Sequence, residues 1–568
     1  MILKAHGTFE QLNMFALVKE SSASRPLESR SKGIRADHSK YWPWIAVAIV
    51  IVFVAIIRIR LLQTPLERDE GEFAYMGQLM LQGIPPYLLA YNMKLPGIYA
   101  VYALIMAIFG QTIRGIHMGL TIVNAIATFL MFLLTRRLFD DVAGVFAAGF
   151  YALLSLSPSV LGTSAHATQF IVPLALGGTF LLIQALDSGK YSALFVSGLL
   201  YGLALMMKQH AVLFVGFGVI YYLWSISRKH PFDLKKLVKG ISLFLVASAI
   251  PFIIGCATLY AVGVFPRFWF WTFTYASQYV SEVPLSTGIR HFMVSARWAI
   301  SPWVWAASGV GLTAIFWNER ARANGVFLIG FSLFSFLSVC PGFFFRNHYF
   351  VTLLPAVALL AGVAASAMRQ FLSDKKTPLV VQILPLLIVA GAVVGPMSIF
   401  TRFFFTAAPA EACRMMYGEN PFPESIEIGE YIRNHSTEDD KIAVIGSEPQ
   451  IYFYANRKSA TGYIYVYGLM EPQDFASRMQ REMIHEIEKA RPKYIVFVNV
   501  PYSWLVRQNS DMTLLKWAQR YLEFNYRVAG LADINPNGIS RIYWNDESIK
   551  NGPRSQSNVY VCERRAEY

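Results

Sequence analysis

Charged residues are scarce in this chain. They make up 15% of its 568 residues, whereas soluble proteins usually carry about 25%. Hydrophobic residues reach 55%, which is more apolar surface than a soluble core needs. The net charge of +14 comes from short basic clusters between apolar runs, and no nucleic-acid-binding module accompanies it. The composition therefore favours a membrane protein and argues against nucleic-acid binding.

Cysteine is also rare, and glycine-rich nucleotide-binding motifs are missing. None of the four cysteines belongs to a CxxC pair or lies beside histidines at zinc-binding spacing, so no metal or other cofactor is indicated, although a divalent ion stays open. Cys413 and Cys562 flank the region after the last apolar run. For these two, a disulfide is one alternative and a pair of free thiols is the other.

Eleven apolar runs are long enough, or nearly so, to cross a bilayer about 30 Å thick. A twelfth run, Ile98–Phe109, is short and ambiguous. If it lies in the interface, dense basic clusters such as Lys235-Lys236 fall in cytoplasmic loops, as the positive-inside rule requires. We therefore predict eleven spans and a cytoplasmic amino terminus. The predicted spans are 44–62, 115–134, 142–160, 168–186, 191–206, 211–227, 238–263, 297–317, 325–341, 348–368 and 377–398.

Three regions follow from this pattern. Residues 1–43 form a basic cytoplasmic tail that we expect to be mobile, and residues 44–400 form the transmembrane region. Residues 401–568 have a soluble composition and alternate strands with helices, which indicates a small α/β domain outside the cytoplasm. Its strands are predicted at Lys441–Gly446, Tyr463–Tyr467, Lys493–Val500 and Arg541–Trp544, and its helices at Glu424–Asn434, Pro472–Ala490 and Met512–Tyr521.

The first outer loop, residues 63–114, carries the strongest functional signal. Asp69, Glu70 and Glu72 directly follow a predicted membrane helix. Carboxylates are costly to desolvate there, so their presence suggests a function. One of them could serve as general base for an acceptor hydroxyl. Solvated loop charge, or a helix cap at Asp69, explains the same residues. The residues alone leave both interpretations open.

This loop resembles the first periplasmic loop of GT-C glycosyltransferases. The resemblance is narrowest to bacterial relatives of protein O-mannosyltransferases and to the lipid A aminoarabinose and galacturonic acid transferases. Later segments, Gly202–Gln209 and Phe344–Tyr349, also resemble the family, whereas His166–Gln169 departs from it because many relatives carry a glutamate there. The loop motifs are Asp69-Glu70, Tyr75, Gly77-Gln78, Gly83-Ile84-Pro85-Pro86-Tyr87 and Lys94-Leu95-Pro96-Gly97.

The resemblance implies a GT-C helical fold whose active site faces the outer side of a bacterial plasma (inner) membrane. It also implies a polyprenyl-phosphate-sugar donor and a lipid, glycan or protein acceptor. Asp69 would be the general base of an inverting transfer, Glu70 would be a second catalytic residue, and Lys94 would stabilise the leaving phosphate. The other candidate substrate-binding residues are Tyr75, Gln78, Lys208, Arg267, Arg346, His348 and Tyr349. For Lys208 and Arg267, a snorkelling interfacial anchor is the alternative.

Two other functions stay open. A transporter or flippase of lipid-linked sugars is the main alternative, although transporters usually have repeated halves and helices broken at the midplane. We see no convincing repeat, and the charged residues lie at the ends of the apolar runs. The second alternative is an outer-face binding or assembly protein with an inactive site.

Overall fold

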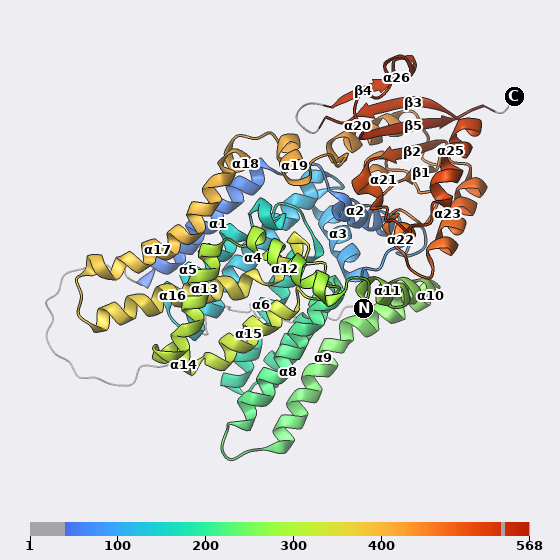
Figure 1. The fold of residues 1–568 in the computed structure, drawn as a ribbon. Helices are drawn as coiled ribbons and strands as arrows, with labels where there is room; N and C mark the ends of the chain where they lie inside the picture. Colours follow the sequence, from blue (N-terminus) through green and yellow to red (C-terminus); the bar gives the residue numbers. More distant parts are fainter. Residues whose placement is uncertain (1–39, 536–539, 567–568) are drawn as a thin grey trace, which may run out of the picture. The chain divides into compact units, whose positions relative to one another are not determined.

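The computed structural model describes residues 40–535 and 540–566 of the chain. The predicted mobile tail, residues 1–43, lies almost wholly outside the described residues. Within them, helices predominate, and a small sheet is built from the last third of the sequence (Figure 1).

Seven helical segments of the described chain are long and apolar enough to cross a membrane. Two more helices, α12 (Leu285–Ala299) and α13 (Pro302–Thr313), meet at a bend of 97° and make at most an eighth span. The multi-pass helical fold is therefore confirmed, whereas the number of eleven spans stays a prediction. The seven segments are α1 (Trp42–Arg60), α4 (Ile113–Leu138), α6 (Ala167–Ser188), η4–α8 (Gln209–Ser227), α9 (Leu234–Ala261), α16 (Leu354–Asp374) and α17–α18 (Leu379–Phe405).

Every predicted apolar run contains a helix, but several of these helices are short or begin late. The run 297–317 is broken at Ile300–Ser301, because Ser301 accepts a hydrogen bond from the Val304 amide and Pro302 starts a new helix. The short apolar helices are α3 (Pro96–Phe109), α5 (Asp141–Leu154), α7 (Tyr191–Met207) and α15 (Gly325–Leu337). Further short elements are η3 (Pro158–Val160), α10 (Phe265–Trp269), η5 (Phe270–Tyr275), α11 (Ala276–Val280), η6 (Ala314–Phe316), α14 (Glu319–Ala323), η7 (Asn347–Thr352) and η8 (Ser398–Phe400).

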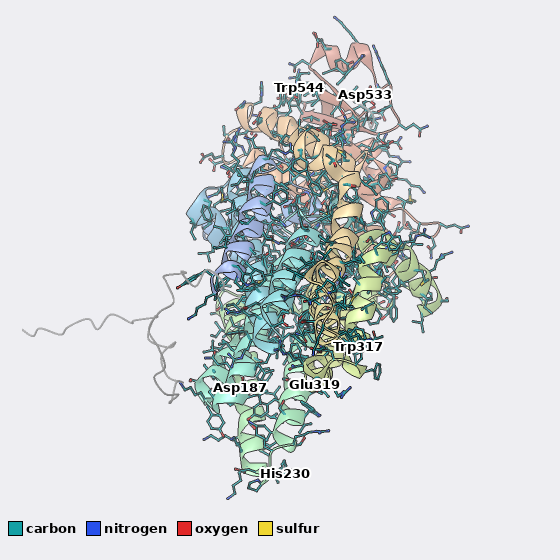
Figure 2. All side chains as sticks on the ribbon, turned by 90° about the vertical axis from the view of Figure 1, so that its left-hand side faces the viewer. Asp187, His230, Trp317, Glu319, Asp533 and Trp544 are labelled. Atoms are coloured by element: carbon teal, nitrogen blue, oxygen red, sulfur yellow. The ribbon has the colours of Figure 1, made fainter. Side chains whose placement is uncertain are left out.

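The outward surfaces of the long helices are apolar. Ile49 on α1, Ile254 on α9 and Val380 on α17 are all exposed, as expected of side chains that face lipid. The charged and aromatic residues labelled in Figure 2 separate into two groups. Asp187, His230, Trp317 and Glu319 lie at the end of the helical region away from the sheet, whereas Asp533 and Trp544 lie on the sheet.

The sheet has five strands in the order β1-β2-β5-β3-β4. Strands β1 (Ile442–Ile445) and β2 (Tyr494–Asn499) are parallel, and the other neighbours are antiparallel. The remaining strands are β3 (Tyr526–Asp533), β4 (Arg541–Trp544) and β5 (Asn558–Arg564). We define the C-terminal region as the described residues from 401 onward. Besides α18 (Thr401–Phe405), which continues the last long apolar segment, its helices are α19 (Pro409–Tyr417), α20 (Phe422–Asn434), α21 (Gln450–Ala455), α22 (Tyr467–Met470), α23 (Ala476–Ala490), α24 (Pro501–Trp504), α25 (Thr513–Asn525) and α26 (Asp546–Asn551).

The predicted strand Tyr463–Tyr467 is wrong. Residues 463–466 form a loop, and Tyr467 begins α22. Side-chain oxygens satisfy the backbone there, because Thr461 Oγ1 accepts from the Tyr463 amide and Ser447 Oγ accepts from the Val466 amide. Two real strands, β3 and β5, were missed.

Helix α2 (Arg68–Leu81) joins the helical region to the C-terminal region. It packs beside α3 on one side and α21 on the other (Figure 1). A Cβ atom on Gly71 would lie 2.5 Å from the Gln450 amide nitrogen, so only glycine allows this approach. Tyr75 stacks on Tyr452 with ring centroids 5.1 Å apart. The helix that carries the three acidic residues is thus built into the C-terminal core.

The cysteines of the described chain are free thiols. Cys413 is buried on α19 near the carbonyl of Pro65, and Cys562 is buried in β5. The alternative of two free thiols therefore holds, and the disulfide alternative is wrong.

Candidate active site

The first turn of α2 is fixed by a capping box. Glu67 is the N-cap, and its side chain accepts from the Glu70 amide at 2.9 Å, while Glu70 accepts from the Glu67 amide at 3.2 Å. Asp69 is therefore not the helix cap, which corrects that alternative. Its carboxylate is free to line a cavity beside α2.

Asp69 lies among cations and aromatic rings. Tyr465 directs its hydroxyl to Asp69 Oδ1 at 3.4 Å, and His166 Nδ1 lies 3.8 Å from Oδ2. Burial alone would raise the pKa of Asp69, but Lys94 first, then His166 and His348, hold this pKa well below its usual value. The carboxylate is therefore ionised at neutral pH.

Three basic residues line the same cavity from distant parts of the chain. Lys94 precedes α3, Lys208 follows α7, and Arg346 precedes η7. Burial lowers the pKa of Lys94, but Asp69 and Glu72 outweigh it, and the pKa is raised. Burial and the neighbouring Lys94 hold the pKa of Lys208 well below its usual value. The cavity thus places the Asp69 carboxylate near several groups suited to bind an anion.

Two further carboxylates on α2 support the walls of the cavity. Glu70 accepts from His117 Nε2 at 2.9 Å and from the Ala165 amide at 2.6 Å, and it does not line the cavity. Glu72 is fully buried and accepts from Asn92 Nδ2 at 2.5 Å and from the Tyr99 hydroxyl at 2.9 Å. Burial raises the pKa of Glu72 to about 8. Of the acidic cluster, Asp69 alone points into the cavity.

Three predicted substrate-binding residues lie outside the cavity lining. Tyr75 accepts from the Ser459 amide at 2.7 Å, and Gln78 donates to Gln111 at 3.2 Å. Arg267 is exposed and donates to the Leu88 carbonyl at 3.0 Å. These contacts support the fold. The structure therefore does not bring these three side chains to Asp69. The predicted residues that share the cavity are Asp69, Lys94, Lys208, Arg346, His348 and Tyr349.

The cavity also contains two aromatic residues that the sequence did not single out. Tyr465 and Tyr467 come from the loop and short helix that replace the predicted strand. Tyr349 receives a cation–π contact from Lys208, whose Nζ lies 3.9 Å from the ring centroid. Such rings offer flat faces on which a sugar can stack. No local motif marks Tyr465 or Tyr467, so the sequence offered no signal for them.

A candidate metal centre lies at the edge of this cavity. Ligand atoms of Asp69, His166 and His348 lie within 4.8 Å of one another, and the two imidazoles stack with centroids 4.2 Å apart. Neither ring nitrogen of the buried His166 makes a hydrogen bond to the described residues. An oxygen and two imidazole nitrogens suit Zn²⁺ and similar divalent ions, so the residues fit a metal. Their wide separation in sequence explains why spacing did not indicate it.

Comparisons with known proteins agree with this architecture. Residues 94–254 match the family model described as dolichyl-phosphate-mannose-protein mannosyltransferase. A comparison with curated proteins found no match. The structure is similar to ArnT from Cupriavidus metallidurans bound to undecaprenyl phosphate, with 14% identity and a TM-score of 0.55, over 92% of this chain and 98% of that chain. It is also similar to the apo oligosaccharyltransferase of Archaeoglobus fulgidus, with 13% identity and a TM-score of 0.54, over 92% of this chain and 76% of that chain. The predicted resemblance is thereby confirmed at the level of the fold: this is a multi-pass membrane protein with the GT-C fold.

Proposed function

We propose that the protein is a membrane glycosyltransferase that transfers a sugar from a polyprenyl-phosphate donor to a hydroxyl acceptor. One observation carries the proposal: the ionised Asp69 shares its cavity with Lys94, Lys208 and Arg346. The family match and the fold support a glycosyltransferase. The donor class is supported by similar structures that hold undecaprenyl phosphate, in ArnT, and dolichol-phosphate with an inhibitory peptide, in the archaeal oligosaccharyltransferase AglB.

The proposed reaction is a direct displacement. Asp69 accepts the proton of the acceptor hydroxyl as that oxygen bonds to the anomeric carbon. The bond from this carbon to the phosphate oxygen breaks, and polyprenyl phosphate leaves with its charge stabilised by Lys94 and Arg346. Glu471, the other carboxylate among the described lining residues, is engaged by the Tyr275 hydroxyl at 2.8 Å. A single available carboxylate favours inversion, because retention needs a second one as nucleophile.

The remaining groups have supporting roles in this proposal. Glu70 holds the first turn of α2 through its capping box and His117, so it positions Asp69 rather than reacting. A divalent metal would be held by Asp69, His166 and His348, and would supply positive charge to the site. A form of the archaeal oligosaccharyltransferase in complex with Zn and sulfate is also similar in structure.

A transfer assay tests the proposed function. Purified protein in nanodiscs is expected to convert a radiolabelled polyprenyl-phosphate sugar to free polyprenyl phosphate and a labelled acceptor. A panel of donors and of lipid, glycan and protein acceptors from cell envelopes would identify both partners. The matched measurement is translocation of the same donor across proteoliposomes. Translocation without any new glycosidic bond would favour the transporter, and neither activity would favour a binding protein.

We also propose that the cavity and the C-terminal domain, residues 401–568, face the outer side of the plasma (inner) membrane. The exposed Leu88 lies in the loop near the cavity, and the exposed Lys235 lies in the opposite basic loop. In a cysteine-free background, Leu88→Cys is expected to react with an impermeant thiol reagent on intact cells, and Lys235→Cys only after lysis. The reverse pattern would place the active site in the cytoplasm. Glu72, although in the same loop, is fully buried and unsuitable for labelling.

A further inference from the structure

Arg68, the residue before Asp69, is held by hydrogen bonds to the C-terminal region. The Arg68 guanidinium donates to the Ser447 carbonyl at 2.6 Å, to Glu448 Oε1 at 2.7 Å and to Asn420 Oδ1 at 2.9 Å. Its carbon Cζ lies 5.2 Å from the ring centroid of Phe422. A planar guanidinium with this many fixed partners has one available orientation, so the first turn of α2 is fixed with it.

Glu448 is the charged partner of Arg68 in these contacts. Its side chain is fully buried, and its second oxygen accepts from the Ser503 hydroxyl at 2.5 Å. Glu448 lies just beyond the carboxyl end of β1, and Ser503 lies on α24 beyond the carboxyl end of the parallel strand β2. Both residues are thus presented from the same edge of the sheet toward α2.

Stability alone explains this pair poorly. A buried ion pair gains little over well-packed apolar side chains of similar size, because the desolvation cost offsets the attraction. The pair does specify geometry, since the charged fork and the carboxylate accept only a narrow range of distances and angles. The residue whose geometry it specifies is adjacent in sequence to the proposed general base.

We propose that Glu448 is a positioning residue that sets the place of Asp69 through Arg68, so that the C-terminal region forms part of the catalytic machinery. This inference rests on the proposed function. Tyr465, from the same region, adds a second contact at 3.4 Å from Asp69 Oδ1. When the Arg68 contacts are lost, α2 keeps its capping box and its packing on α21 through Tyr75 and Tyr452, but Asp69 loses the constraint that Arg68 imposes. A displacement of about 1 Å is enough to lower a rate by about 10²-fold.

A paired substitution separates positioning from stability. The double variant Arg68→Met with Glu448→Met removes both charges together, so no uncompensated buried charge remains and folding is expected to survive. The matched control is Arg414→Met with Glu424→Met, which removes another largely buried ion pair of the same region whose members do not line the cavity. The readouts are the unfolding temperature, the affinity for undecaprenyl phosphate, and kcat with KM for the sugar donor.

The expected result is a split between binding and turnover. The Arg68–Glu448 double variant is expected to bind undecaprenyl phosphate normally while kcat falls about 10- to 100-fold, and the control pair is expected to keep its kcat. If the double variant fails to fold, we measure Glu448→Gln instead, which keeps the shape of the side chain and loses its charge. This variant is expected to have a lower kcat and an unchanged KM for the donor. Suppose that the wild type is active and that Asp69→Asn is inactive. An unchanged kcat in the folded Arg68–Glu448 or Glu448→Gln variant would then overturn the positioning role of Glu448 and leave the proposed function intact. Absence of transfer by the wild type would instead overturn the proposed function.

Discussion

Asp69→Asn is expected to lower turnover by about 10²- to 10⁴-fold, the usual effect of losing a general base. Asparagine keeps the shape of the side chain and cannot accept the proton of the acceptor hydroxyl. Because this interaction belongs mainly to the transition state, affinity for the polyprenyl-phosphate donor should hold roughly steady. The measurement is sugar transfer by purified variant and wild type at saturating donor, with folding checked by thermal unfolding.

Glu70→Gln is the internal control for this prediction. Glu70 lies beside Asp69 in sequence, yet it accepts hydrogen bonds from His117 and from the Ala165 amide, away from the cavity. Glutamine can keep some of these contacts, so we expect a smaller loss of turnover, accompanied by a lower unfolding temperature. Near-normal turnover by well-folded Asp69→Asn would contradict the assignment. A larger loss of turnover in Glu70→Gln than in Asp69→Asn would show that Glu70, and not Asp69, is the general base.

The different positions of Asp69 and Glu70 show what sequence reasoning could not resolve. Successive residues of a helix point about 100° apart, so two adjacent carboxylates face different surroundings once the helix register is known. The motif placed both near the site without stating which one faces the cavity. The register follows from the N-cap at Glu67, and the sequence had suggested Asp69 for that position.

The basic residues were easier to predict than the aromatic ones. Lys94, Lys208 and Arg346 are rare charges at the ends of apolar runs, so their positions stand out against a hydrophobic background, and all three line the cavity. Arg267 has the same signal and lies outside it, because a charge at a helix end can equally be an interfacial anchor. Tyr465 carries no such signal in a chain whose aromatic content is 15%.

The fold shows the same division between what is local and what is not. Apolar runs reveal helices because each run must satisfy its own backbone in the membrane, and every predicted run contains one. Strands depend on partners far away in sequence. Strand β3 contains a register shift between Val528 and Gly530, and β5 lies near the end of the chain. The segment Tyr463–Tyr467 alternates like a strand, but it forms a loop and the start of α22, from which Tyr465 and Tyr467 line the cavity.

Lys94→Ala is expected to affect both binding and turnover. The Lys94 backbone is fixed, because its carbonyl accepts from the Tyr87 hydroxyl at 2.6 Å and the preceding Met93 carbonyl accepts from Gln209 at 2.6 Å. The side chain therefore enters the cavity from a rigid support and, with its raised pKa, is charged at neutral pH. Loss of one charged hydrogen bond to the phosphate should weaken undecaprenyl phosphate binding by about 10- to 100-fold. Turnover should fall further, since the phosphate gains charge as it leaves.

Arg267→Ala provides the matched control for Lys94→Ala. The sequence predicted both residues as donor-binding cations, whereas the structure places Lys94 in the cavity and Arg267 on the exposed surface over Tyr91. We therefore expect Arg267→Ala to bind undecaprenyl phosphate like the wild type in a calorimetric titration. Wild-type affinity in Lys94→Ala combined with a clear loss in Arg267→Ala would reverse the assignment and move the phosphate site out to the membrane interface. A loss in Lys94→Ala alone, together with a normal affinity in Asp69→Asn, would separate the group that holds the phosphate from the group that takes the proton.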